Sequence, residues 1–247
     1  MDYTTKIIFL FFTLFLIIGC KNIESENHRI LIIYDVTGST QSNLPNADKV
    51  LKDIAKIYDL SDKNEMDNYI HDGFEIGFTF LDELSDARTI RKTLKPAKGT
   101  TAEVNPKKRK RLIKDYSESI HEMIGKALTG TPADRPMSKI YAKLCKALNK
   151  EAGQNADTRH VIIYTDLLEN SELAKFYNPK TLQQAAQAPV EFSKKHLESF
   201  CQFGDLSAIT IHLYPYRTAG TDAFINQAEK FWVTLLENHG ATVKVNP

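Results

Sequence analysis

Apolar residues follow two different spacings along the chain, and these spacings predict strands and helices in alternation. Continuous apolar runs are typical of parallel strands covered on both faces, and strict alternation is typical of a strand with two unlike faces. The predicted core strands are residues 30–34, 74–80, 161–164 and 209–214, and short edge strands are predicted at 88–94 and 241–245. The strand at 88–94 is polar and is expected to form a hairpin with 74–80.

Between these strands the apolar residues recur at the spacing of one helix face. The predicted helices cover residues 50–58, 106–127, 140–151, 171–197 and 224–236. Asn105 is expected to cap the second helix and Pro106 to open it, whereas Pro179 and Pro189 are expected to break the fourth. This alternation predicts an α/β fold: a doubly wound, mostly parallel six-stranded sheet with helices on both faces.

The N-terminal segment differs from the rest of the chain. Residues 7–18 are apolar except for Thr13, a length typical of the central part of an export signal. The segment ends in Gly19-Cys20, which resembles the lipobox of bacterial lipoproteins, where the cysteine is lipidated and becomes the mature N-terminus. We therefore expect a signal peptide at 1–19, a polar tether at 20–28 and one domain at 29–247. The lipid on Cys20 is expected to anchor the mature protein to a membrane of the bacterial cell envelope, on the extracytoplasmic side.

Composition excludes several classes of function. The 247 residues carry a formal net charge of +1, and 42% of them are hydrophobic, which disfavours a disordered chain or a nucleic-acid binder.

The basic run 107–111 is predicted to be a solvated helix face. Export permits a disulfide between Cys145 and Cys201, but their apolar surroundings favour two buried thiols.

Two predicted core strands end in the same way, each with an aspartate. Asp35 closes the first strand and Asp166 follows strand 161–164. In doubly wound sheets ligands bind outside the carboxyl ends of the strands, where the strand order reverses. If the order is 3-2-1-4-5-6, these two strands are neighbours, and both carboxylates face one site and are close enough to share a cation.

Asp35 opens the motif Asp35-x-Thr37-x-Ser39, which resembles the Asp-x-Ser-x-Ser motif of von Willebrand factor A-type (VWA) domains. In that family the motif begins the metal-ion-dependent adhesion site. The resemblance implies Mg²⁺ or Mn²⁺ bound by Asp35, Thr37, Ser39, Asp166 and a third hydroxyl from a later loop. Ser138 as a helix N-cap and Thr131 in a Gly-Thr pair both remain candidates for that hydroxyl. Leu167 departs from the family, which often has glycine there, so we expect another loop shape.

The resemblance implies a binding module rather than an enzyme. Hard oxygen ligands suit Mg²⁺, and an acidic side chain of a protein partner would complete the ion's coordination. Two alternatives stay open. In the first, Asp35 and Asp166 only cap the following segments, and the domain is a metal-free structural or interaction module. In the second, the chain resembles the haloacid-dehalogenase phosphohydrolases, although Thr37 stands where those enzymes have a second carboxylate.

Overall fold

A computed structural model describes residues 23–36, 45–59, 69–81, 89–99, 104–129, 139–217 and 221–246 of the chain. The strands are β1 (Asn27–Asp35), β2 (Gly73–Leu81), β3 (Ile90–Leu94), β4 (Thr158–Thr165), β5 (Thr210–Pro215) and β6 (Thr242–Val245). The helices are α2 (Ala47–Ile57), α3 (Pro106–Thr129), α4 (Ile140–Ala152), α5 (Pro179–Gln187), α6 (Pro189–His196) and α7 (Asp222–Asn238). The alternation of strands and helices predicted from the apolar pattern is therefore confirmed.

The strands form one six-stranded sheet in the order β3-β2-β1-β4-β5-β6. β3 runs antiparallel to β2, as predicted for a hairpin, and the remaining pairs are parallel. β1 pairs with β4 in a register that sets Tyr34 opposite Tyr164. This arrangement confirms the doubly wound α/β class and places the reversal of strand order between β1 and β4.

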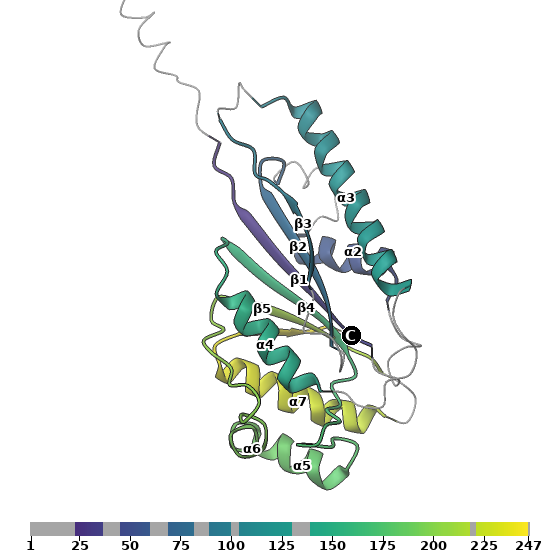
Figure 1. Cartoon of the computed structure of the whole chain (residues 1–247), viewed down its shortest axis with the longest axis vertical. Helices are drawn as coiled ribbons and strands as arrows, with labels where there is room; N and C mark the ends of the chain where they lie inside the picture. Colours follow the sequence, from purple (N-terminus) through teal and green to yellow (C-terminus); the bar gives the residue numbers. More distant parts are fainter. Residues whose placement is uncertain are drawn as a thin grey trace, which may run out of the picture.

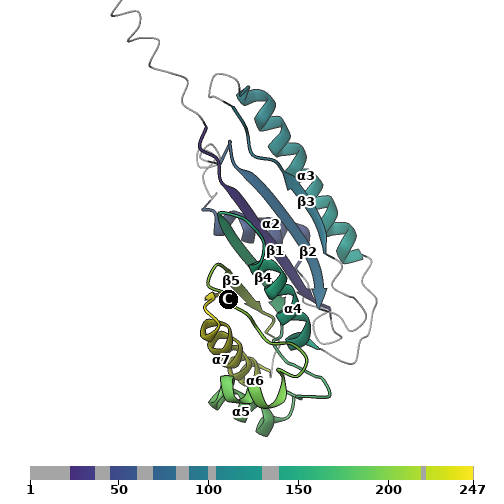
Figure 2. The same cartoon turned by 60° about the vertical axis from the view of Figure 1, so that its left-hand side comes forward.

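Helices cover both faces of the sheet, so each face has its own apolar core (Figures 1 and 2). α2 and α3 pack on one face, where Val50, Ile120 and Ile124 meet Ile30 and Ile32 of β1. α4 and α7, with α5 and α6 outside α7, cover the other face. Successive residues of β1 alternate between the two cores, which explains why the strand is a continuous apolar run.

Three local predictions require correction. The helical stretch expected from residue 171 begins only at Pro179, which therefore opens α5 instead of interrupting a helix. The break expected near Pro189 is confirmed, because α5 ends at Gln187 and α6 opens at Pro189. Proline suits a first helical position because its missing N–H would have no intrahelical acceptor there. β1 begins at Asn27, inside the predicted tether, because the ring of His28 is buried and contacts Thr158 and Asp72.

The basic run 107–111 is not uniformly solvated. Asn105 does cap α3, since its side chain accepts the Lys108 N–H at 3.2 Å. Arg109, however, is buried and donates hydrogen bonds to the carbonyl oxygens of Ile70, Lys95 and Asp72. The prediction of a solvated face is therefore wrong for Arg109, whose guanidinium satisfies three backbone acceptors that irregular segments would otherwise leave without donors.

Cys145 and Cys201 form a disulfide, so the prediction of two buried thiols is wrong. The bond joins α4 to the segment that follows α6. Asn149, one turn after Cys145, holds the same segment by donating to the carbonyl of Gln202 at 2.8 Å and accepting the Gly204 N–H at 2.9 Å. These tertiary contacts bring the two cysteines within bonding distance, and apolar surroundings alone could not indicate them.

Two histidines on neighbouring strands lead to a pH-dependence prediction. His160 Nδ1 lies 3.1 Å from His212 Nε2, and burial, followed by nearby positive charge, lowers both pKa values to about 4. The unfolded chain binds these protons near pH 6.5, so this contribution to stability is complete above pH 6.5 and is lost as the pH falls toward 4. We expect the pair to account for about 1–3 kcal/mol of the loss between pH 7.5 and 4.5, after allowance for solvent screening.

Urea unfolding of wild type and His212→Gln at both pH values measures this contribution. The variant is expected to lose less stability on acidification than wild type does. His121→Gln is the matched control, because the ring of His121 is exposed and pairs with Asp48 at the surface. A His212→Gln protein with the same acid loss as wild type would contradict the assignment.

Candidate metal and ligand site

The two predicted aspartates lie at the carboxyl ends of adjacent strands. Asp35 is the last residue of β1, and Asp166 directly follows β4. Since β1 and β4 are parallel neighbours, both residues occupy the edge of the sheet at which the strand order reverses. We call this place the β1–β4 edge. The strand placement is as predicted, and the role of the two residues as metal ligands stays a prediction.

Thr165 links the two strand ends. Its hydroxyl donates to Asp35 Oδ2 at 2.7 Å and accepts the Leu167 N–H at 2.9 Å. The Asp35 side chain is completely buried, so this hydroxyl holds a carboxylate that water does not solvate. The backbone after β4 is thereby tied to the carboxylate at the end of β1.

Leu167 takes a backbone conformation that usually favours glycine. Its φ is 63°, in the left-handed region, and its side chain is buried. Trp232 of α7 donates its indole N–H to the Leu167 carbonyl at 3.0 Å, and Thr165 binds the Leu167 N–H. These contacts and the apolar core hold leucine in the left-handed conformation despite its cost of about 1–2 kcal/mol. The expectation of a loop shape other than the family's stays a prediction.

The loop after β4 also engages the Asp166 carboxylate. Oδ1 accepts the Leu168 N–H at 2.9 Å, and Oδ2 accepts the hydroxyl of Tyr177 at 3.2 Å. The Tyr177 ring is nearly half exposed, so a surface aromatic side chain contacts the carboxylate. Asp166 therefore has a structural role in its own loop.

A third carboxylate, Glu169, was not predicted from the sequence. It is 2% exposed and accepts the Tyr141 N–H at 2.7 Å. Burial raises the pKa of Glu169 to about 7, bonds from Ser171 and Tyr141 oppose that rise, and the charge of Asp35 adds to it. The sequence shows only that a glutamate follows Asp166 by three residues. The contact of Glu169 with α4 is tertiary, so the sequence pattern does not indicate it.

Glu169 also caps the N-terminus of α4. The helix begins at Ile140, with Lys139 at the N-cap position and no side-chain cap of its own. The predicted N-cap, Ser138, would lie one residue earlier. The Glu169 carboxylate performs the capping function by accepting an N–H from the first turn.

Tyr216 is the second residue that the sequence did not reveal. Its N–H donates to the Thr165 carbonyl at 2.8 Å, which anchors it beside β4. Its hydroxyl is buried and has no hydrogen-bond partner in the part of the chain that the structure describes. Burial raises the Tyr216 pKa, and electrostatic interactions with Tyr34, Asp35 and Asp166 raise it further. A buried hydroxyl without a partner is costly, so this site suits an additional polar group.

Two of the predicted ligands lie among the described residues, and both are carboxylates, a ligand type that hard divalent cations prefer. A positive charge near Asp35 and Glu169 would be favoured, because burial and the nearby Asp35 charge raise the Glu169 pKa and so disfavour its ionised form. Among the described residues no three His, Cys, Asp or Glu side chains cluster as metal ligands. The predicted hydroxyl ligands Thr37, Ser39, Thr131 and Ser138 lie outside the described residues.

The predicted lipidation residue Cys20 and the signal segment 1–19 also lie outside the described residues. Within the described ranges, no helix has the length and apolar character needed to span a membrane. Ile23 makes the first described tertiary contact, donating its N–H to the Gly99 carbonyl at 3.2 Å.

No family model and no curated protein matches the chain. Among solved structures, an aerotolerance-related membrane protein from Bacteroides fragilis aligns over 89% of this chain and 92% of its own, with 11% identity and a TM-score of 0.36. BatB from Bacteroides thetaiotaomicron aligns over 89% and 91%, with 14% identity and a TM-score of 0.35. The PilB minor pilin from Streptococcus sanguinis aligns over 89% and 57%, with 12% identity and a TM-score of 0.45. Likenesses this distant do not identify a function.

Proposed function

We propose that the chain is a VWA-type binding domain carried by a lipoprotein of the bacterial cell envelope, and that a divalent metal at the β1–β4 edge binds an acidic group of a protein partner. The observation that supports this proposal is the position of Asp35 and Asp166 at the carboxyl ends of adjacent strands where the strand order reverses, with Thr165 bonded to Asp35. The Asp35-x-Thr37-x-Ser39 motif begins at this edge.

Each predicted ligand has a defined part in this proposal. Asp35, Thr37, Ser39 and Asp166, with Ser138 or Thr131, would hold Mg²⁺ or Mn²⁺. When bound, the ion supplies a coordination position that a carboxylate of the partner can occupy. Thr165 keeps the Asp35 carboxylate oriented, and Glu169 holds the start of α4 against the same edge. No proton transfer or covalent step is required, so the proposal assigns no catalytic residue.

The strongest competing candidate is a metal-free interaction domain with the same fold. One specific observation favours it: each carboxylate oxygen of Asp166 already accepts a hydrogen bond, one from Leu168 and one from Tyr177. A carboxylate engaged in this way stabilises its loop without a metal. The phosphohydrolase alternative gains no support from the described residues.

A thermal titration separates the two candidates. At a metal concentration 100 times Kd, Mg²⁺ or Mn²⁺ is expected to raise the Tm of the wild-type protein by about 5–10 °C, because an ion that binds only the folded state stabilises it. Asp35→Asn should abolish the rise, since the amide still accepts the Thr165 hydroxyl but lacks the charge.

Asp115→Asn removes an exposed carboxylate of α3 and serves as the matched control, which should keep the full metal response. Identical melting curves with and without metal in wild type would overturn the metal site and leave the metal-free interaction domain. A metal response retained by Asp35→Asn would overturn the assignment of Asp35.

A further inference from the structure

A basic groove lies between α4 and β3, away from the β1–β4 edge. It has a volume of about 220 Å³ and is lined by Leu31 and Ala147, by Arg91 of β3, and by Lys143, Lys146 and Lys150 of α4. The volume is smaller than the roughly 300–1,000 Å³ typical of sites for drug-sized ligands. The groove therefore suits a small anion or one charged group of a larger molecule.

The lysines line the groove because of their spacing on α4. Positions 143, 146 and 150 are three and four residues apart, so they project from one side of the helix. Ala147 lies among them, and its small side chain leaves the hollow open. The negative end of the helix dipole favours Lys150 in the last turn, but it gives no such support to Lys143 in the first.

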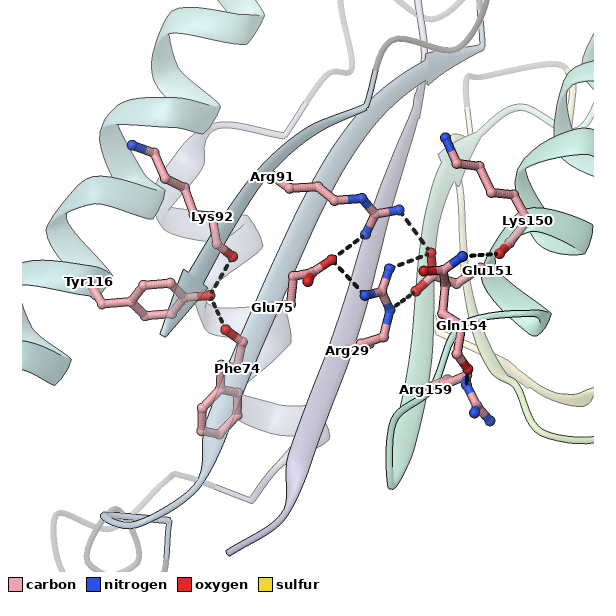
Figure 3. A network of polar contacts seen from close by, with 10 residues as sticks. All are labelled: Arg29, Phe74, Glu75, Arg91, Lys92, Tyr116, Lys150, Glu151, Gln154 and Arg159. Atoms are coloured by element: carbon pink, nitrogen blue, oxygen red, sulfur yellow. Dashed lines mark hydrogen bonds and ion pairs between the residues drawn. The ribbon is translucent and has the colours of Figure 1, made fainter. Parts of the chain in front are cut away.

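Arg91 is held rigidly at the opposite wall of the groove. Its Nη1 donates to Glu75 at 3.0 Å and its Nη2 donates to Glu151 at 3.1 Å (Figure 3). These bonds use two of the five guanidinium N–H donors, and the other three have no acceptor in the described ranges. A guanidinium fixed in this way can bind an anion with little further loss of side-chain entropy.

The acidic side chains described nearby do not neutralise Lys146 and Lys150. Glu75 and Glu151 are both bonded to Arg29 as well as to Arg91, so two cations already balance these two anions. Lys146 and Lys150 have no acidic partner among the residues that the structure describes. The wall formed by α4 is therefore positively charged, and an anion in the groove would relieve the repulsion between like charges.

We propose that this groove is a binding site for phosphate groups. A tetrahedral phosphate has several strong acceptor oxygens, and it can accept hydrogen bonds from a guanidinium and from ammonium groups on the opposite wall at the same time. The groove is independent of the proposed metal site, because none of its lining residues belongs to the β1–β4 edge. The phosphate comes either from a soluble phosphorylated molecule or from a phospholipid headgroup.

Calorimetric titration with inorganic pyrophosphate in metal-free buffer of low ionic strength tests the soluble source. Cosedimentation with phosphatidylglycerol vesicles, compared with phosphatidylcholine vesicles, tests the lipid source. We expect Lys146→Gln/Lys150→Gln to weaken binding of the successful probe at least tenfold, because two charge-assisted contacts are removed. Both side chains are exposed, so the fold should be unaffected.

Lys194→Gln/Lys195→Gln is the matched control, since it removes the same charge from two exposed lysines of α6. Binding that this control retains and the groove variant loses supports the proposal, and the probe that binds identifies the source. Equal weakening in both variants would show a nonspecific charge effect and overturn the groove. Absence of binding to pyrophosphate and to both vesicle types would overturn it as well.

Discussion

Replacement of Glu151 by glutamine is expected to lower the free energy of unfolding by about 3–5 kcal/mol, a magnitude typical of breaking a buried ion pair from one side. The Glu151 side chain is 1% exposed; Oε1 accepts Arg29 Nε at 2.7 Å, and Oε2 accepts Arg91 Nη2 at 3.1 Å. Burial tends to lower the pKa of Arg29, but its contacts with Glu151 and Glu75 raise that pKa overall. The variant would leave Glu75 as the one remaining anionic partner of Arg29 and Arg91 among the described residues, and urea unfolding measures the loss.

The matched control is Glu118→Gln on the exposed surface of α3. Glu118 lies 3.8 Å from Lys114 one turn earlier, and both side chains are largely solvated. Such a pair contributes about 0.3–0.5 kcal/mol, so the control should stay close to wild type. A loss below 1 kcal/mol in Glu151→Gln would show that the protein relaxes or admits water around Arg29, and that the network does not stabilise the fold as we infer.

This network could not be predicted from the sequence, because its members come from four separate elements. Arg29, Glu75, Arg91 and Glu151 belong to β1, β2, β3 and α4, and no local pattern connects them. Arg29 and Glu75 are brought together by strand register, since they are opposite one another across β1 and β2. Charged residues within strands are ordinarily assigned to solvent, and only the tertiary arrangement shows that these are paired.

The fold could be predicted from the sequence because each strand and helix is indicated by a local pattern of apolar residues. The apolar run of β1 and the 3.6-residue spacing of α7 each reflect the surfaces that those elements bury. The strand order followed from the general rule for doubly wound sheets. Element boundaries were less accurate: Pro179 opens α5 rather than breaking a helix, because sequence pattern alone does not distinguish a proline at a helix start from one that interrupts a helix.

In the candidate site as well, residues placed by local sequence could be predicted, whereas residues placed by tertiary contacts could not. The placement of Asp35 and Asp166 could be predicted because Asp35 ends an apolar strand and Asp166 directly follows one, so each placement depends on local sequence. Glu169 and Tyr216 could not, since one is defined by its bond to α4 and the other by burial beside both aspartates. The left-handed conformation of Leu167 depends on Trp232, which is 65 residues away in the sequence.

Reduction of the Cys145–Cys201 disulfide is expected to lower the free energy of unfolding by about 4 kcal/mol. The cysteines are 56 residues apart, and the loop they close contains β4, α5 and α6. A cross-link over a loop of this length restricts the unfolded chain, and the chain-entropy relation gives a cost of that size when it is lost. Urea unfolding with and without a thiol reductant measures the difference in midpoint.

The native state should survive reduction, because Asn149 continues to hold the segment after α6 through its bonds to Gln202 and Gly204. Cys145→Ala/Cys201→Ala should therefore fold, unfold at lower urea than oxidised wild type, and show no response to reductant. Asn149→Ala should still respond to reductant as wild type does, because its lost contacts belong to the folded state and the cross-link acts mainly on the unfolded chain. Thiol titration should confirm that the disulfide is reduced. If the urea midpoint of the reduced wild-type protein is then unchanged, the cross-link does not stabilise the fold by restricting the unfolded chain. The stability of this half of the sheet would then come from the apolar core between β4, α4 and α7 and from the Asn149 hydrogen bonds.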